Sequence, residues 1–442
     1  MNKISLKKIP LFLLILLPFA IIVGQAPSDI IVSLISILFL INSTINKDWN
    51  WLKIKWVKII FFLWIYLIFA SFFALDLKIA LEHSILFIRF FIFAIALQYW
   101  VLNNSKYLIY ILYSTSIAFI FVFIDTFYQF LNFDIIKGYG PDILGYYSND
   151  HFRLTGPFRS NIPGAYLSKF FFIIFLFTLV KSKKRNNDNW IFVPLITLIF
   201  FLIFLTGEAM SFASVGLALL ILFLLEKKFR KKIILSLVIL FCLIFIAIKF
   251  NPAWKKIEIV EKNPWHNGTI YQIDVPCENE KNKMCKKKFE TQPFFYEVLI
   301  NFRKSAYWET YNQAITIWKD HSIFGIGIKN YTTACELEKY KKNFKYFFCT
   351  THPHNFFIQW LLETGILGLT GFLILLYCWF KDFIININQK IEPLYYAPLL
   401  TLIVIFWPIM STGSFFSNRN ATMNWFIIAL CLAINNFKNK KL

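Results

Sequence analysis

Long apolar runs, separated by short polar segments, follow one another along the whole chain. Twelve of them approach the roughly 20 residues that a helix needs to cross the hydrocarbon core of a bilayer. These runs cover residues 9–24, 28–42, 57–73, 84–102, 107–131, 161–180, 190–206, 210–225, 233–250, 355–379, 395–410 and 421–436. The pattern predicts an all-α protein, a polytopic transmembrane helical bundle of about 12 spans. No small-residue cleavage site follows the first run, so we interpret it as a span and not as a signal peptide.

The distribution of charged residues along the chain predicts how the helical bundle is oriented in the membrane. The net charge is +21, but the basic residues sit in short clusters between apolar runs and not on one polar face. If the N-terminus is inside, the inner segments hold 22 Lys and Arg residues and the short outer segments hold five. The positive-inside rule then places both termini in the cytoplasm. A composition that is 58% apolar argues against an ordinary soluble domain, and this distribution of charge argues against a nucleic-acid partner.

One outer segment is long, and it divides the chain into three regions. Residues 1–250 are expected to hold spans one to nine, residues 251–352 an outer loop, and residues 353–442 the last three spans. Four of the seven cysteines, Cys277, Cys285, Cys335 and Cys349, fall in this loop. An oxidising compartment favours disulfides there. Three pairings are possible, and the sequence alone does not choose among them. The local pairs Cys277–Cys285 and Cys335–Cys349 are the favoured ones, and free thiols are the alternative.

The second half of this loop has a helical pattern. Tyr307, Tyr311, Ala314 and Trp318 recur at helical spacing, which predicts an amphipathic helix over residues 302–320. Its apolar face is expected on the membrane or on the top of the bundle. The Phe324-Gly-Ile-Gly-Ile run that follows is expected to be a turn. It is not a phosphate loop, because it lacks the preceding strand and the full glycine spacing.

Ionisable residues inside apolar spans are rare and often functional. Arg89, Asp125, Lys169 and Glu363 fall in the outer half of their spans, and Glu208 lies at the outer tip between the seventh and eighth spans. The pattern predicts a buried polar site that opens outward. A purely structural Arg89–Asp125 pair is the leading alternative for those two residues, whereas structural and functional roles stay equally open for Lys169 and Glu363.

The tenth span begins with Thr350-Thr-His-Pro-His-Asn. Asn355, Gln359 and Glu363 follow at intervals of four residues and form one polar stripe down an apolar helix. Gly365 and Gly368 are expected to admit a close neighbour. His354 would lie at a helix N-terminus, where the positive field disfavours the imidazolium form. This placement predicts either a neutral imidazole that accepts a proton or a simple polar cap.

Four sequence elements together resemble the O-antigen ligase and polymerase family. HPHNFFIQWLLETGILGL, at residues 352–369, is similar to that family's His-Asn…Glu-x-Gly-x-x-Gly signature. RLTGPFRSNIPGAYLS, at residues 153–168, and LTGEAMSFASV, at residues 205–215, resemble two further elements. Residues 308–326 are similar to the family's tryptophan helix and Gly-x-Gly turn. The resemblance implies a GT-C-like glycosyltransferase of the bacterial inner membrane, with its large loop in the periplasm.

The resemblance also implies a chemistry and a set of site residues. The donor would be a glycan on undecaprenyl pyrophosphate, and the acceptor a lipid A–core or another periplasmic glycan. His354 would act as base or acceptor positioner, and Arg303 as the pyrophosphate clamp, although Arg303 precedes Trp308 by one residue more than usual. The other residues expected to bind substrate are Arg153, Arg159, Lys169, Arg89, Asn355, Glu363 and Glu208. Inversion at the sugar would follow, and neither a cofactor nor a metal is expected, since no Asp-x-Asp element stands out.

One position departs from the family pattern. Ala209 stands where the family usually carries an arginine that engages the pyrophosphate. Arg89, Arg159 or Lys169 would then have to take its place. A ligase-like transferase is therefore the leading interpretation, and a polymerase with the same donor or a degenerate non-catalytic homologue stays open. A transporter is the last alternative; it would carry internal repeats and broken midplane helices, and the sequence indicates neither.

The charge asymmetry gives a direct test of topology. A reporter fused after Leu442 should signal from the cytoplasm, and a reporter inserted near Lys283 should signal from the periplasm, because the basic clusters hold the inner segments inside. Paired alkaline phosphatase and fluorescent protein fusions measure both positions. A cytoplasmic signal from the Lys283 insertion would overturn the orientation.

Overall fold

Helices dominate the protein, as the apolar runs predicted. The computed structural model describes residues 7–134, 138–148, 153–159, 163–185, 190–250, 258–262, 269–276, 284–291, 300–341, 350–390, 395–410 and 412–436. The α-helices are α1 (Lys8–Val23), α2 (Gln25–Ile45), α3 (Lys55–Ser71), α4 (Leu77–Leu86), α5 (Ile88–Ile95), α6 (Ser105–Leu131), α7 (Pro163–Arg185), α8 (Phe192–Leu205), α9 (Ala209–Leu225), α10 (Arg230–Phe250), α12 (Ala306–Asp320), α13 (Tyr331–Glu336), α14 (Glu338–Lys341), α15 (Phe356–Lys390), α16 (Tyr396–Phe406) and α17 (Asn418–Asn436).

Shorter elements connect these helices. They are the 3₁₀ turns η1 (Asn50–Lys53), η3 (Gly156–Phe158), η4 (Lys227–Phe229) and η6 (Phe302–Lys304), and the π-helical η2 (Ala96–Val101), which continues α5. Local signals account for some boundaries. The Asp76 carboxylate caps α4 by accepting from the Ile79 N–H at 3.0 Å, and Pro163 opens α7.

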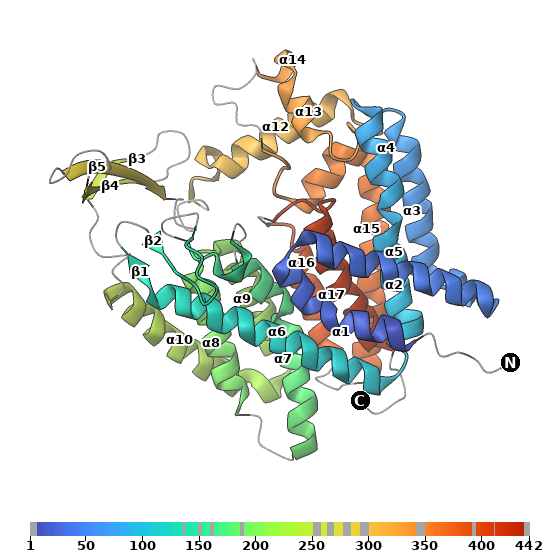
Figure 1. Ribbon diagram of the computed structural model, residues 1–442, viewed down its shortest axis with the longest axis horizontal. Coiled ribbons are helices and arrows are strands. Elements are labelled where there is room, and N and C mark those ends of the chain that lie inside the picture. The colour runs from blue at the N-terminus through green and yellow to red at the C-terminus, as the bar shows by residue number, and fades with distance from the viewer. Residues whose placement is uncertain are drawn as a thin grey trace. The chain divides into compact units, whose positions relative to one another are not determined.

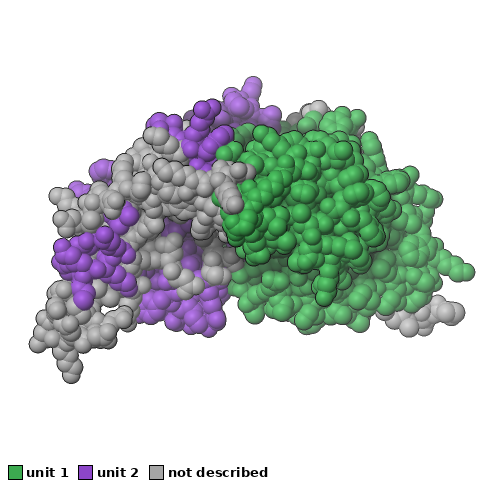
Figure 2. Space-filling model, turned by 90° about the horizontal axis from the view of Figure 1, so that it is seen from above, with its two compact units in different colours: residues 1–119, 169–189, 310–442 green, residues 120–168, 190–309 purple. Residues whose placement is uncertain are grey.

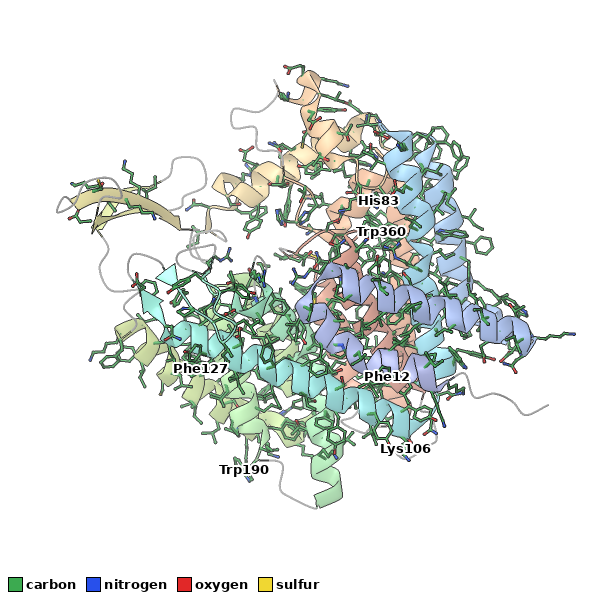
Figure 3. The ribbon with its side chains drawn as sticks, viewed as in Figure 1. Phe12, His83, Lys106, Phe127, Trp190 and Trp360 are labelled. Atoms are coloured by element: carbon green, nitrogen blue, oxygen red, sulfur yellow. The ribbon has the colours of Figure 1, made fainter. Side chains whose placement is uncertain are left out.

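Each of the twelve apolar runs forms a helix. The length and apolar composition of these helices indicate a membrane protein. Within the described residues, six helices are long and apolar enough to cross a bilayer: Gln25–Ile45, Leu77–Val101, Ser105–Leu131, Pro163–Lys181, Lys227–Phe250 and Phe356–Ile387. Large apolar side chains point outward, including Phe12, Trp190 and Phe241, which are 60%, 52% and 69% exposed. Figure 3 labels Phe12 and Trp190. Such exposure is expected where lipid, and not water, surrounds the helices.

The chain forms two compact units, coloured separately in Figure 2. Unit 1 holds residues 1–119, 169–189 and 310–442, and unit 2 holds residues 120–168 and 190–309. In unit 1, α3 packs against α4 and α15, while α17 packs against α2, α5 and α16 (Figure 1). In unit 2, α8 packs against α9 and α10. The division into residues 1–250, 251–352 and 353–442 follows membrane topology, and it stays a prediction.

The core of unit 1 is built from aromatic rings. Trp360 of α15, labelled in Figure 3, stacks on Phe372 with ring centroids 4.7 Å apart and planes 6° apart. Trp360 also contacts Phe415 edge-on at 5.5 Å, and Phe415 approaches Trp425 of α17 at 6.4 Å. Offset and edge-to-face pairs of this kind stabilise packing beyond the area they bury. They hold α15 and α17 in one core.

Helix α15 is broken at Gly365, where the sequence indicated a continuous span. Gly365 has φ 67° and ψ −174°, which is not helical. A turn at residues 322–327 closes the break with three backbone hydrogen bonds. The Ile326 N–H donates to the Leu362 carbonyl at 3.0 Å, the Gly327 N–H to the Glu363 carbonyl at 2.9 Å, and the Ile366 N–H to the Ser322 carbonyl at 2.9 Å. The expectation of unbroken helices was therefore wrong at this point.

Glycine at position 325 makes that closure possible. Gly325 has φ +74°, and a Cβ added there would lie 2.5 Å from the backbone of both Glu363 and Gly365. The turn thus contacts the backbone of α15 directly. The Phe324-Gly-Ile-Gly-Ile run had predicted the turn itself. Gly368 serves the role expected of it, because a Cβ there would lie 3.0 Å from the Tyr66 ring of α3.

The amphipathic helix expected over residues 302–320 is confirmed, with a later start than expected. It is α12, and η6 precedes it in place of its first turn. Ala314 and Ile317 are fully buried in a cluster that includes Tyr331, Tyr340 and Leu362. The apolar face of α12 therefore packs on α15, α13 and α14. Of the two expected locations, the membrane and the top of the helical bundle, the structure favours the bundle.

The protein is all-α as expected, apart from short strands, and three of these strands form a sheet within residues 251–352. Strands β3 (Glu258–Lys262), β4 (Thr269–Pro276) and β5 (Met284–Thr291) form an antiparallel sheet in the order β3-β4-β5 (Figure 1). The β-branched and aromatic residues of TIYQIDV favour a strand. Cys285 on β5 is disulfide-bonded, as expected for the loop, while Cys277 and Cys349 lie outside the described residues. A second antiparallel pair joins β1 (Phe133–Asp134) to β2 (Gly138–Tyr139).

The packed turn predicts a strong effect of a single methyl group. Gly325→Ala should lower the stability of the protein by about 3 kcal/mol, because strain at positive φ adds to a clash with the α15 backbone. Gly145→Ala is the matched control, since Gly145 has φ +85° with nothing within 4 Å of an added Cβ. Only the strain, on the order of 1 kcal/mol, should act there. Thermal unfolding of both purified variants measures the difference, and equal losses would contradict the packing argument.

Candidate functional site

Asn355 fixes the N-terminus of α15. Its Oδ1 accepts from the N–H groups of Phe357 at 2.9 Å and Ile358 at 3.2 Å, which satisfies two backbone donors that the first turn leaves free. Its Nδ2 donates to the Pro408 carbonyl at 2.8 Å. The predicted polar stripe therefore begins as a helix cap that also binds the α16–α17 connection, here residues 407–410 and 412–417.

Two histidines lie just before this cap, with ring centroids 4.2 Å apart. His352 Nε2 is 3.0 Å from the Thr412 carbonyl oxygen, and its Nδ1 is 2.8 Å from Thr351 Oγ1. A carbonyl oxygen only accepts, so Nε2 carries the proton and Nδ1 accepts from the threonine hydroxyl. Burial, with a smaller contribution from His354, lowers the pKa of His352 to about 4. Both ring nitrogens of His352 are therefore occupied, and the ring is neutral.

His354 has a different environment. Its backbone has φ +56°, and its carbonyl accepts from the Thr412 N–H at 2.9 Å. Burial lowers the pKa of the His354 ring, and a hydrogen bond with the Thr412 backbone acts in the opposite direction. The ring is consequently neutral at pH 7 and able to accept a proton. This agrees with the neutral imidazole expected from the sequence, and burial is the largest cause of the lowered pKa.

The polar stripe continues down α15 as a hydrogen-bonded chain. Gln359 Nε2 donates to Glu363 Oε1 at 2.9 Å and to Ser414 Oγ at 2.8 Å. Gln359 Oε1 accepts from the Phe415 N–H at 2.8 Å, and Glu363 Oε2 accepts from the Lys329 N–H at 2.9 Å. The stripe therefore joins α15 to the α16–α17 connection on one side and to the residues after the 322–327 turn on the other.

The α16–α17 connection is the part of the site that sequence reasoning missed. It contacts α15 and its N-terminal residues through Pro408, Thr412, Ser414 and Phe415, mostly by backbone atoms. It also accepts at the Met410 carbonyl from the Tyr311 hydroxyl of α12, at 2.8 Å. Backbone contacts leave no side-chain pattern. The only available signal was the position of this connection, since it is an outer segment on the predicted topology.

Lys169 lies beside the start of α15. Its ammonium donates to Asn424 Oδ1 at 3.0 Å and is 5.8 Å from the centroid of the Phe356 ring. The side chain is buried, at 5% exposed. Of the predicted site residues, His354, Asn355, Glu363 and Lys169 thus cluster around the first turns of α15, within unit 1.

Arg89 is also in unit 1, but it has another partner. Its Nε and Nη2 donate to the two oxygens of Asp29 at 2.9 and 3.2 Å, and its Nη1 donates to the Leu86 carbonyl. Asp125 instead accepts from the Ile143 N–H at 3.0 Å. The expected Arg89–Asp125 pair was wrong, because α2 supplies a carboxylate in the geometry of a bidentate pair.

In unit 2, Arg153 lies at the hairpin between α8 and α9. It pairs with Glu208 at 3.0 Å and donates to the Gly207 carbonyl at 3.4 Å. Ala209 is the first residue of α9, directly after this pair. A guanidinium is therefore present at this hairpin, although Ala209 stands where the resemblance implies an arginine. From the sequence, we expected Arg89, Arg159 or Lys169 to replace the missing arginine at this position. Arg153 was expected to have only a supporting role.

The other two arginines of unit 2 that the sequence placed in the site, Arg159 and Arg303, both lie over aromatic rings. The Arg159 guanidinium is 3.6 Å from the centroid of the Tyr146 ring. Arg303 is exposed, and its guanidinium is 5.9 Å from the Trp308 ring. Stacking leaves the in-plane N–H groups of a guanidinium available to oxygen acceptors.

Among the described residues, no group of three or more His, Cys, Asp or Glu side chains could hold a metal ion. The residues around the first turns of α15 supply imidazole, amide, carboxylate and cationic side chains. These groups can bind anions, position hydroxyl groups and accept a proton.

The depressed pKa of His352 predicts an acid-sensitive fold. The folded pKa, about 4, lies below the ordinary 6.5, so the unfolded chain binds a proton in that window that the folded chain does not. Stability should be complete above pH 6.5 and should fall, on the order of 1 kcal/mol per pH unit, down to about pH 4. His352→Gln keeps a donor for the Thr412 carbonyl but does not titrate. Its melting temperature should fall less than that of the wild type between pH 7.5 and 5, and identical slopes would contradict the assignment.

Comparison with known protein families gives one match, which covers part of the chain. Residues 194–373 match the family model described as O-antigen ligase. Curated proteins give no match to the chain. The matched range runs from α8 into α15 and includes the α8–α9 hairpin, Arg303, α12, the 322–327 turn, His354 and Glu363. Through these residues, the chain is similar to the O-antigen ligase family.

Proposed function

We propose that this membrane protein transfers a glycan from undecaprenyl pyrophosphate to a lipid A–core or other periplasmic acceptor. One observation carries the proposal: within the family-matched range, the neutral and half-buried imidazole of His354 lies directly before the first turn of α15, with Thr412 as backbone partner. A neutral imidazole is the form that accepts a proton near pH 7. Such a base is what a hydroxyl acceptor needs.

The proposed reaction is a single displacement. The acceptor hydroxyl oxygen forms a bond to the anomeric carbon of the donor, and the bond from that carbon to the phosphate oxygen breaks. The hydroxyl proton passes to the free ring nitrogen of His354, and undecaprenyl pyrophosphate leaves with the bonding electron pair. Attack opposite the leaving group inverts the anomeric centre. His352 holds Thr412 in place and takes no proton, because both of its nitrogens are engaged.

Cationic side chains would stabilise the negative charge that develops on the pyrophosphate. Arg153 at the α8–α9 hairpin and Arg303 before α12 are the proposed clamp, with Arg159 in support. The Arg153–Glu208 pair supports this role, since it fixes a guanidinium beside Ala209. Lys169 next to Phe356 and Asn355 at the cap are proposed as further substrate contacts. The proposed chemistry uses no metal ion and no cofactor.

The proposed setting is the bacterial inner membrane, with about twelve spans, a GT-C-like bundle and both termini in the cytoplasm. The twelve helices at the predicted positions support the span count, and the distribution of Lys and Arg supports the orientation. Residues 251–352 and the N-terminus of α15 would then lie on the periplasmic side, where the lipid-linked donor and its acceptor meet.

The break in α15 is the one observation that favours a transporter, because broken helices line many transport sites. The backbone groups at this break, however, are bonded to the 322–327 turn of the same chain. They are not left to coordinate a passing ion. A polymerase would use the same donor and the same residues, and a degenerate homologue would keep the fold without transfer. Both stay as alternatives within the family.

Removing the proposed base should abolish transfer without unfolding the protein. His354→Ala should lower the transfer rate at least a hundredfold, the range that general base catalysis contributes. The loss in stability should be small, since the ring is only half-buried. The assay follows glycan moving from extracted lipid-linked donor to lipid A–core in proteoliposomes of the purified protein.

His321→Ala is the control, because His321 follows α12 and lies outside the site. It should retain transfer. Wild-type turnover by His354→Ala would remove this residue from the mechanism. Labelled glycan that enters sealed vesicles without reaching the acceptor would support the transporter instead, and products lengthened by repeat units would support the polymerase.

A further inference from the structure

We infer that Glu363 is a positioning residue, which sets the orientation of His354 through Gln359 and the α16–α17 connection and does not bind the donor. The inference rests on the proposed function in taking His354 as the base. It assigns a different role to a carboxylate that the sequence placed among the substrate-binding residues.

Burial and hydrogen bonding exclude Glu363 from direct contact with substrate in this structure. The side chain is 1% exposed. Its Oε1 accepts from Gln359 Nε2 at 2.9 Å, and its Oε2 accepts from the Lys329 N–H at 2.9 Å. Both partners are N–H donors, which matches a carboxylate that acts only as an acceptor. A residue that bound pyrophosphate or a sugar would need at least one atom open to it.

The contacts continue from Glu363 to the histidines. Gln359 bonds both to Ser414 Oγ and to the Phe415 N–H, at 2.8 Å each. Two residues before Ser414, Thr412 accepts from His352 Nε2 and donates its N–H to the His354 carbonyl. The positions of Gln359 and of the connection therefore set the place of the backbone atoms that hold both imidazole rings.

Glu363→Gln should break this chain at one point whichever way the new amide turns. Its oxygen can accept from the Lys329 N–H, but its NH₂ then faces the NH₂ of Gln359. Turning the Gln359 amide to relieve this contact would place that NH₂ against the Phe415 N–H. One buried donor is left without a partner in either case, which is costly away from water.

The double exchange should repair the chain. With Gln359→Glu alone, two carboxylates face each other where Gln359 Nε2 now meets Glu363 Oε1. With Glu363→Gln and Gln359→Glu together, the new amide donates to the new carboxylate and accepts from the Lys329 N–H. The new carboxylate still accepts from the Phe415 N–H, and the Ser414 hydroxyl can donate to it. Every hydrogen bond of the chain is then restored. Donor and acceptor are exchanged between residues 359 and 363 and between residue 359 and Ser414, while the Lys329 and Phe415 N–H groups donate as before.

The experiment compares the two single variants and the double variant, purified in lipid nanodiscs. Each single variant should lower kcat roughly tenfold, the effect of one lost buried hydrogen bond, with KM for the donor within about twofold of wild type. The double variant should recover kcat to within about threefold. Carbon-13 NMR of ring-labelled histidine adds a readout that needs no transfer. The signals of His352 and His354, assigned from His352→Gln and His354→Ala, should shift in the singles and return in the double.

Glu338→Gln is the matched control, because Glu338 is exposed on α14 and pairs only with Lys341 among the contacts the structure gives it. It should leave both readouts unchanged. A raised KM with unmoved histidine signals would show that Glu363 binds substrate, and a double variant no better than the singles would remove the relay. If the singles do not fold, a folded and active double variant supports the relay, and a double that also fails to fold overturns it. If even the wild type transfers no glycan, the proposed function fails, while the histidine signals still decide the relay.

Discussion

The break in α15 is the constraint on which the rest of the site depends. In hydrocarbon there is no water to satisfy a backbone N–H or carbonyl, so a helix interrupted at membrane depth must find its partners in the protein. Here the 322–327 turn supplies them, and only glycine at position 325 lets two backbones meet so closely. Helix α12 is thereby attached to α15 at its C-terminal end. Its apolar face is buried on α15, α13 and α14 for the same reason.

The same break explains why the polar stripe does not destabilise α15. A carboxylate and an amide buried in an apolar helix carry a large desolvation cost unless every polar atom has a partner. Glu363 obtains one partner from the residue next to the turn, Lys329, and Gln359 obtains two from the α16–α17 connection. Polar groups that are satisfied in this way hold one geometry. The N-terminus of α15, with its two histidines, is thus fixed by contacts deeper in the helix.

The sequence predicted the parts of the fold that depend on long-range composition. Each apolar run became a helix, because twenty apolar residues carry a strong signal however the neighbours pack. Asn355, Gln359 and Glu363 were predicted as one stripe from spacing alone. The break at Gly365 was not predicted, since a glycine in an apolar helix more often permits close packing, as Gly368 does. The partner of Arg89 was missed for a similar reason, because the choice between Asp29 and Asp125 depends on which helices meet.

Ala209 shows how a missing side chain can be misleading when the sequence is considered one position at a time. A clamp for a pyrophosphate requires a guanidinium at a place in space, and several positions of the chain can supply it. The Arg153 guanidinium lies at the Gly207–Glu208 hairpin, although its α-carbon belongs to the segment before α7. Glu208 both fixes that guanidinium and reduces its net charge, so the pair is preorganised but weaker as an anion site than a free arginine. On the proposed function, an incoming pyrophosphate would have to compete with the Glu208 carboxylate, so donor binding and the Arg153–Glu208 pair would oppose each other.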